Sequence, residues 1–190
     1  AFKIVVDGVC SSGGIAIPKL LRALGAEVVE LYCEPTGHFP HNPEPLKEHL
    51  GAICEKVVEE NADFGIVVDP DVDRLAFITE KGEMFGEEYT LVACADYVLS
   101  KTPGNTVSNL SSTRALRDVT EKHGGTYTAA AVGEVNVVTT MKSQNAVIGG
   151  EGNGGIIYPE SHYGRDALVG TALFLMLLSE KDLPVSALKA

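Results

Sequence analysis

The stretch FGIVVDPDVDRLAFIT, residues 64–79, decides the fold of this chain. Two short apolar runs rich in β-branched residues, 66–68 and 75–78, predict two strands joined by a sharp turn. The turn carries Asp69, Asp71 and Asp73. Alternation along an extended backbone directs these three carboxylates into one small volume. At an effective dielectric near 20, each pair about 5 Å apart repels by about 3 kcal/mol, which one neighbouring guanidinium cannot offset. A divalent cation is therefore expected.

The predicted metal site has only oxygen ligands. Oxygen ligands favour a hard cation, so Mg²⁺ is the first expectation and Ca²⁺ or Mn²⁺ the second. An EF-hand calcium loop is a rival, because acidic residues occupy four of its ligand positions: Asp69, Asp71, Asp73 and Glu80. Its sixth position needs Gly and here holds Arg74. A solvated acidic turn is another alternative. A phosphatase or transferase with an Asp nucleophile fits less well, because no D-x-D-x-T/V arrangement with an accompanying lysine is present.

Composition narrows the classes of partner. The formal charge of −11 argues against nucleic acid and anionic membranes, because the chain offers them no basic footprint. Four cysteines without a C-x-x-C pair indicate buried free thiols in a reducing cytoplasm. A signal peptide is not expected, and no apolar run is long enough to span a bilayer. The expectation is a cytoplasmic α/β protein that binds neither nucleic acid nor membrane.

The chain repeats itself. Strand-like and helical segments alternate from residue 3 to residue 84, and the same order starts again at residue 105. Setting Ser11 and Ser12 over the serines at 111 and 112 also places Gly25 over Gly125. The simplest account is two copies of one α/β unit, each with a polar loop at the same strand end.

The second polar loop reads GGEGNGG, residues 149–155. Superposing the strands before the two loops places Asp71 on Glu151 and Asp73 on Asn153. The glycines let the backbone approach a ligand, while Glu151 supplies an acceptor and Asn153 both a donor and an acceptor. This pairing suits sugar hydroxyls. The alternative is a flexible turn whose glycines serve only backbone conformation.

Four stretches together resemble the α-D-phosphohexomutase family, which includes phosphoglucomutase, phosphomannomutase and phosphoglucosamine mutase. DPDVDR at 69–74 resembles the metal loop of that family and GGEGNGG its sugar loop, and FPHNPEP at 39–45 and AVGEVNV at 131–137 resemble further stretches. The resemblance covers the second and third of four family domains. It implies two similar three-layer α/β/α domains with mixed sheets, a tandem repeat divided into residues 1–84 and 85–190.

The resemblance also implies roles for residues. Asp69, Asp71 and Asp73 would hold Mg²⁺ together with a phosphoserine oxygen from a domain outside this chain. Arg74 would bind phosphate or orient the loop and is the one candidate catalytic residue. The candidate substrate-binding residues are Glu151, Asn153, Gly155, His162 and Arg165, of which Arg165 alternatively pairs with Asp166.

The implied chemistry is reversible phosphoryl transfer between O1 and O6 of a hexose or hexosamine, through a bisphosphorylated sugar. Two residues depart from the family pattern: Asn153 stands where Ser is common, and Ala131 where Lys is common, so no general acid or base is assigned there. Without the N-terminal and C-terminal domains we expect the chain to be inactive. A non-catalytic sugar-phosphate binding module is the alternative.

The remaining polar residues are interpreted structurally. Ser11 and Ser12 precede a predicted helix and are expected to be caps, as are residues 111–113. The alternative is that serines at a helix N-terminus hold phosphate. Glu134 is expected to open a helix and Asp166 to cap one. His38 and His41 have no Cys or carboxylate at ligand spacing, so no zinc site is expected.

Overall fold

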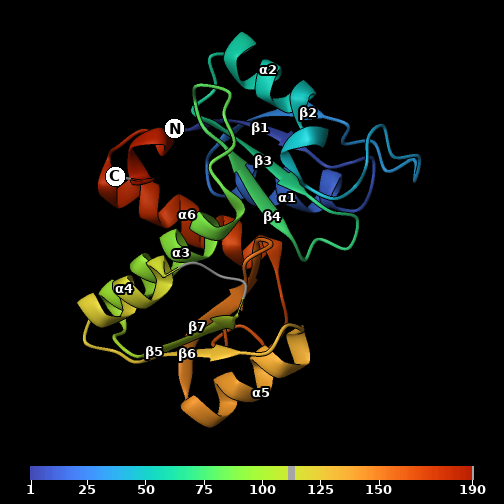
Figure 1. Cartoon of the computed structure of the whole chain (residues 1–190). Coiled ribbons are helices and arrows are strands. Elements are labelled where there is room, and N and C mark those ends of the chain that lie inside the picture. Colours follow the sequence, from blue (N-terminus) through green and yellow to red (C-terminus); the bar gives the residue numbers. More distant parts are fainter. Residues whose placement is uncertain (111–113, 190) are drawn as a thin grey trace. The chain divides into compact units, whose positions relative to one another are not determined.

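The computed structural model describes residues 1–110 and 114–189 (Figure 1). The chain forms two compact units, one containing Ala1–Gly86 and the residues from Asp182 onward, the other containing Glu87–Lys181. Each unit holds one four-stranded sheet with parallel and antiparallel pairs. The predicted class, two α/β domains with mixed sheets, is confirmed.

The sheet of the first unit has the order β2-β1-β3-β4. Its elements are β1 (Lys3–Asp7), α1 (Gly13–Ala23), β2 (Glu27–Leu31), the 3₁₀ helix η1 (Lys47–His49), α2 (Gly51–Glu59), β3 (Phe64–Val68) and β4 (Leu75–Ile78). The C-terminal 3₁₀ helix η2 (Val185–Lys189) belongs to this unit too. The first three strands pair in parallel, and only β4 runs antiparallel.

Helix α2 begins later than the apolar spacing predicts. Leu46, Leu50, Ile53 and Val57 recur at helical spacing, which predicts a helix from Leu46 onward. The backbone of Leu46 is extended instead, and the short helix η1 separates it from Gly51. The four prolines upstream keep the segment before Leu46 out of helix and strand.

The core of the first unit explains why β3 reads as a continuous apolar run. Every residue of β3 is buried. On one face Val67 packs in a cluster with Ile53 and Val57 of α2. On β1 and β3, the intervening residues Ile4 and Ile66 point to the other face and are also fully buried. A strand covered on both faces needs apolar residues at every position.

The second unit repeats this topology, with the sheet order β6-β5-β7-β8. Its elements are α3 (Glu87–Lys101), β5 (Asn105–Asn109), α4 (Ala115–Lys122), β6 (Tyr127–Ala130), α5 (Glu134–Gln144), β7 (Ala146–Glu151), β8 (Gly155–Ile157) and α6 (Ala167–Lys181). The equal strand order confirms the internal repeat. A smaller cluster of buried residues, among them Val107, Val137 and Met141, forms part of its core.

The second polar loop differs from its prediction. Strand β7 continues through Gly149 and Gly150 to Glu151, which pairs with Gly155 on β8. The connection between β7 and β8 is therefore only residues 152–154, which is shorter than the connection between β3 and β4, residues 69–74. Glu151 therefore ends a strand, as Val68 does, and the superposition of Asp71 on Glu151 is wrong. Glycines carry no side chains that would display the alternation of a strand, so the hairpin left no pattern in the sequence.

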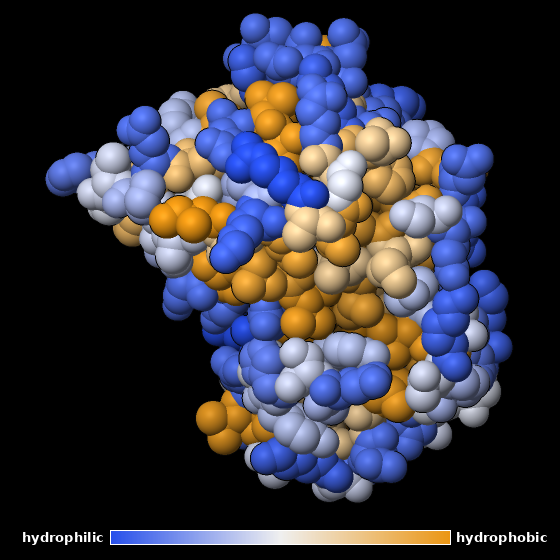
Figure 2. All heavy atoms as spheres, turned by 180° about the vertical axis from the view of Figure 1, so that it is seen from behind, coloured by the Kyte–Doolittle hydropathy of each residue, from blue (hydrophilic) through white to orange (hydrophobic). Residues whose placement is uncertain are grey.

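Both polar and apolar side chains reach the surface (Figure 2). The most exposed large apolar residues include Leu110 and Val135, both in the second unit. Within the part of the chain that the structure describes, no helix combines the length and the apolar character needed to cross a membrane.

Candidate functional site

The three aspartates of the 69–74 connection converge, as alternation predicts. One carboxylate oxygen each from Asp69, Asp71 and Asp73 lies within 4.8 Å of the other two. Asp69 is buried, Asp73 is partly buried and Asp71 is exposed. The cluster thus has one side anchored in the protein and one side open to solvent. We call residues 69–74 the metal loop.

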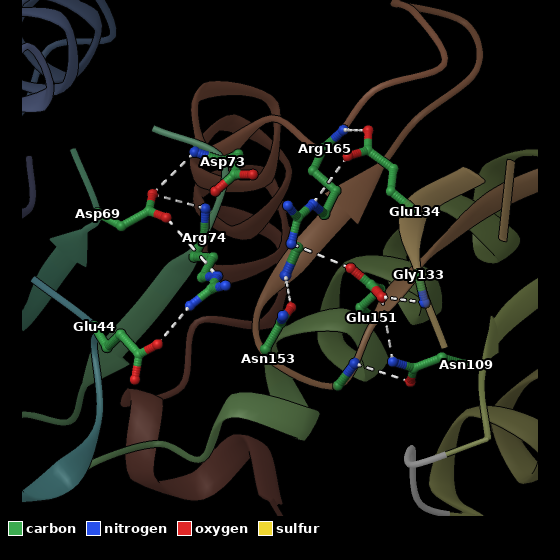
Figure 3. Close-up of polar contacts among 12 residues, drawn as sticks. Glu44, Asp69, Asp73, Arg74, Asn109, Gly133, Glu134, Glu151, Asn153 and Arg165 are labelled. Atoms are coloured by element: carbon green, nitrogen blue, oxygen red, sulfur yellow. Dashed lines mark hydrogen bonds and ion pairs between the residues drawn. The ribbon is translucent and has the colours of Figure 1, made fainter. Parts of the chain in front are cut away.

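Asp69 shapes the metal loop around itself. Its Oδ1 atom accepts hydrogen bonds from the backbone N–H groups of Asp73 and Arg74, each at 3.0 Å (Figure 3). Its carbonyl oxygen accepts the N–H of Val72 at 3.1 Å. Val72 has φ of +59°, a left-handed conformation that a β-branched residue rarely adopts. Such a conformation persists only where the surroundings enforce it.

The electrostatics of the loop call for a cation. Burial, and then the adjacent Asp73 carboxyl, raise the pKa of Asp69 to about 7. Without a cation this carboxyl therefore takes up a proton near neutral pH. The set of three carboxylates, one of them buried and held in place by backbone N–H groups, fits Mg²⁺.

Arg74 lies at the edge of this cluster. Its Nη1 atom is 3.4 Å from Oε1 of Glu44, and its Nε atom is 3.9 Å from Oδ2 of Asp69 (Figure 3). About a third of the side chain is exposed. The Arg74 guanidinium is thus oriented by two carboxylates and is still accessible to an anion.

In the second unit, Glu151 is the most enclosed of the predicted sugar-binding side chains. The residue is only 5% exposed. Its Oε1 atom accepts the N–H of Gly133 at 3.1 Å and a longer bond, at 3.5 Å, from the Asn109 amide (Figure 3). Its Oε2 atom lies 3.1 Å from Nη1 of Arg165. Three elements, β5, the start of α5 and the segment after β8, therefore orient one carboxylate.

Arg165 pairs with Glu134, a partner that the sequence did not suggest. Glu134 accepts both the backbone N–H of Arg165, at 3.1 Å, and its Nε–H, at 3.3 Å. Glu134 also opens α5 as predicted. The guanidinium thus bridges two carboxylates, Glu134 and Glu151. Both lie too far from Arg165 in the sequence for local spacing to predict these ion pairs.

Gly155 gives Arg165 its path to Glu151. A Cβ atom at residue 155 would lie 2.4 Å from Cδ of Arg165, so only glycine leaves room for this side chain. The Asn153 side chain accepts the N–H of Gly155 at 3.3 Å and so helps to form the turn. Asp166 caps α6 as predicted, because Oδ1 accepts the N–H groups of Leu168 and Val169.

His162 lies close to the same helix start. Its Nε2 atom is 2.8 Å from Oδ2 of Asp166, and half of its side chain is exposed. The ring is thus oriented by a carboxylate but reaches solvent. Its contact with a substrate stays a prediction.

Comparison with known proteins identifies the family. A family model described as phosphoglucomutase/phosphomannomutase, alpha/beta/alpha domain II, matches residues 1–82, and the corresponding model of domain III matches residues 86–190. The chain belongs to the phosphoglucomutase/phosphomannomutase family. The resemblance inferred from the four sequence stretches is thereby confirmed.

Individual family members agree with this assignment. The chain is 36% identical over 187 residues to a protein of Thermococcus kodakarensis named phosphoglucomutase/phosphomannomutase, with 97% of this chain and 41% of that protein covered. It is 35% identical over 184 residues to a phosphomannomutase/phosphoglucomutase of Pseudomonas putida, covering 95% of this chain and 40% of that protein.

A solved structure agrees as well. The crystal structure of a phosphoglucomutase/phosphomannomutase family protein from Burkholderia thailandensis superposes with a TM-score of 0.91 at 30% identity, covering 99% of this chain and 42% of that one. The chain thus spans about 40% of the length of the family members it matches.

Two polar groups of the first unit have partners that the sequence did not reveal. Ser11 and Ser12 were expected to cap α1, but Ser12, at the N-cap position, makes no side-chain cap bond. Instead both hydroxyls donate to the carbonyl oxygen of Pro70 in the metal loop, at 3.2 and 3.0 Å. The capping prediction for these serines is wrong. The corresponding prediction for residues 111–113 lies outside the described residues.

His41 has a carboxylate partner that is distant in sequence. Its Nε2 atom lies 2.7 Å from Oδ2 of Asp7, and its Nδ1 atom 2.7 Å from the carbonyl oxygen of Asn42. Asp7 is 1% exposed, and burial raises its pKa. This contact joins the proline-rich segment 33–46 to the end of β1.

Proposed function

We propose that this chain forms the metal-binding and sugar-binding domains of a phosphohexomutase. The whole enzyme would transfer a phosphoryl group between O1 and O6 of a hexose or hexosamine, through a bisphosphorylated sugar and a phosphoserine that lies outside this chain. We divide the chain into a metal-loop domain, residues 1–84, and a sugar-loop domain, residues 85–190. The observation that carries the proposal is the convergence of three carboxylates within the segment that matches domain II of the family.

In this proposal Asp69, Asp71 and Asp73 hold Mg²⁺. The bound ion supplies charge neutralisation at a phosphoryl group. Asp69 keeps the loop folded through the two backbone N–H groups that it accepts. Arg74, steadied by Glu44, binds a phosphate oxygen, a role for which a partly exposed guanidinium is suited.

The sugar is held by the second unit. Glu151 accepts a hydrogen bond from a sugar hydroxyl, since a carboxylate accepts about four hydrogen bonds and the three donors named above leave room for one. Arg165 fixes the direction of that carboxylate. Asn153, Gly155 and His162 complete the proposed substrate contacts.

The first experiment tests the metal site. We titrate Mg²⁺ into the chain and follow backbone amide resonances by NMR. Saturable, weak binding centred on the metal loop is expected, because the phosphoserine ligand is missing. The variant Asp71→Asn should lose saturation, whereas Asp118→Asn, an exposed carboxylate on α4, should behave as the unmodified chain. Equal, non-saturating shifts in all three proteins would remove the metal claim.

The second experiment tests the enzyme. This chain replaces the matching segment of the Thermococcus kodakarensis family member, which supplies the other domains. Conversion of glucose, mannose and glucosamine 1-phosphates to the 6-phosphates is then measured, with Asp71→Asn and Glu151→Gln as inactive controls. A folded chimera that binds a sugar bisphosphate and turns over none of the three favours the non-catalytic binding module.

The cytoplasm is the compartment that we propose. All four cysteines are free, and those at 33 and 94 are buried. Free thiols of this kind suit a reducing environment.

A further inference from the structure

We propose that Ser11 and Ser12 are positioning residues for the metal loop: their hydroxyl groups hold the Pro70 carbonyl so that the three aspartates converge. This inference rests on the metal-binding role proposed above. It assigns a function to a serine pair that the sequence pattern attributed to helix capping.

The contact itself is specific. Pro70 stands between two of the proposed ligands, Asp69 and Asp71, so its carbonyl lies in the middle of the ligand-bearing backbone. The Ser11 and Ser12 hydroxyls both donate to this one oxygen atom, at 3.2 and 3.0 Å. A carbonyl oxygen has two lone pairs, and the two serines use both.

The serines stand on a rigid support. Val9 and Cys10, which precede them, have φ values of +48° and +52°, a left-handed conformation. Val9 is fully buried, and its N–H donates to Oδ1 of the buried Asp7 at 2.9 Å. The Cys10 N–H donates to the carbonyl oxygen of Tyr32 at 2.7 Å. A β-branched residue keeps this conformation only where its surroundings enforce it, so the turn presents the hydroxyl groups in one fixed place.

A second contact joins the same segment to the metal loop. A Cβ atom on Gly13 would lie 2.4 Å from Cγ2 of Val68, the last residue of β3, and 3.5 Å from Cγ2 of Val72 in the loop. The start of α1 therefore lies directly against the residue before the aspartate turn, Val68, and against Val72 within the turn. Steric packing and hydrogen bonding thus act on the loop from one side.

The serine side chains are used for the loop and not for the helix. A serine at an N-cap usually accepts a hydrogen bond from a backbone N–H of the first turn. Ser12 occupies this position without such a side-chain bond, and its hydroxyl donates to Pro70 instead. The pair therefore orients the loop backbone, on which the direction of the aspartate side chains depends.

The test measures Mn²⁺ affinity of the intact chain, with free Mn²⁺ quantified by electron paramagnetic resonance after removal of metal with a chelator. One hydrogen bond is worth about a two- to tenfold factor in an equilibrium constant. We therefore expect a dissociation constant raised about threefold in Ser12→Ala and about tenfold in the double variant Ser11→Ala/Ser12→Ala. Ser12→Thr keeps a hydroxyl and should restore most of the affinity.

The control is Thr36→Ala, which removes a hydroxyl that accepts the His38 N–H in the proline-rich segment of the same unit. It should leave the affinity unchanged, and circular dichroism should show all variants folded. Saturable binding by the unmodified chain, with equal affinity in the double variant, would overturn the positioning role and leave the metal site standing. Absence of saturable binding in the unmodified chain would overturn both proposals.

Discussion

Replacing Asp69 with asparagine should remove a pH dependence of stability in the metal-free protein. Burial, and then the neighbouring Asp73, raise the pKa of Asp69 from 3.8 to about 7 in the folded chain. A carboxyl whose pKa is raised by folding stabilises the folded state only while it is protonated. Its contribution is complete below the unfolded value and is lost as the pH rises through the folded value.

The size of this effect follows from the shift. The difference between about 7 and 3.8 is about 3 units, and each unit corresponds to about 1.4 kcal/mol, so the ceiling is about 4 kcal/mol. We expect the stability of the unmodified chain to fall by about 2–4 kcal/mol between acidic and mildly alkaline pH. The amide side chain introduced by Asp69→Asn carries no charge but keeps Oδ1, the atom that accepts the N–H groups of Asp73 and Arg74.

Urea unfolding in the presence of a chelator measures the effect. The chain has no Trp, so far-UV circular dichroism is the suitable signal. Asp7 also has a raised pKa, but its contribution is common to both proteins and cancels in their difference. That difference should change with pH, and Asp118→Asn should show no such change. Added Mg²⁺ should stabilise only proteins that retain Asp69. If the free energy of unfolding of the unmodified chain and of Asp69→Asn changed with pH in the same way, the reasoning would be refuted.

Three further substitutions test the packing described above. Gly155→Ala should lower the free energy of unfolding by about 1–3 kcal/mol and displace Arg165 from Glu151, which changes the NMR signal of the Arg165 Nε–H. The control Gly51→Ala should not destabilise the chain, because a Cβ atom there meets no atom within 4 Å. His41→Ala should lower the free energy of unfolding by about 1–3 kcal/mol, because buried Asp7 loses its partner; the exposed His38→Ala should have little effect, and equal values would contradict the pairing. Ile53→Ala, at a fully buried position of α2, should cost about 2–5 kcal/mol, against about 0.5 kcal/mol or less for the half-exposed Val58→Ala on the same helix. Urea unfolding measures all three pairs.

Local patterns in the sequence were sufficient for most of the fold. The apolar runs around residues 66 and 76 predicted β3 and β4, and their buried positions confirm the reason. The alternation of aspartates between them predicted that the carboxylates converge, which the 4.8 Å cluster bears out. The repeated order of elements predicted two units with equal topology. Each of these inferences depends on neighbours along the chain, which share a strand or a turn.

Strand β8 was not predicted, because the residues that precede it have no strand pattern. Residues 149–155 contain five glycines, and glycine has no side chain to display the alternation of a strand. In the folded chain the glycines allow close approach within the hairpin: a Cβ on Gly150 would lie 2.1 Å from the carbonyl oxygen of Gly155. The sequence suggested a loop where pairing between strands makes a hairpin.

The partners of the polar side chains were decided only by tertiary structure. Ser11 donates to Pro70 across 59 positions, His41 contacts Asp7 across 34, and Arg165 reaches Glu134 across 31. Side chains so far apart in the chain meet because the parallel strands place their carboxyl ends at one edge of each sheet, and the order of strands is set by burial over a whole unit. Residue types and local spacing therefore determined which groups are available for chemistry, while the packing of the sheets determined which of them touch.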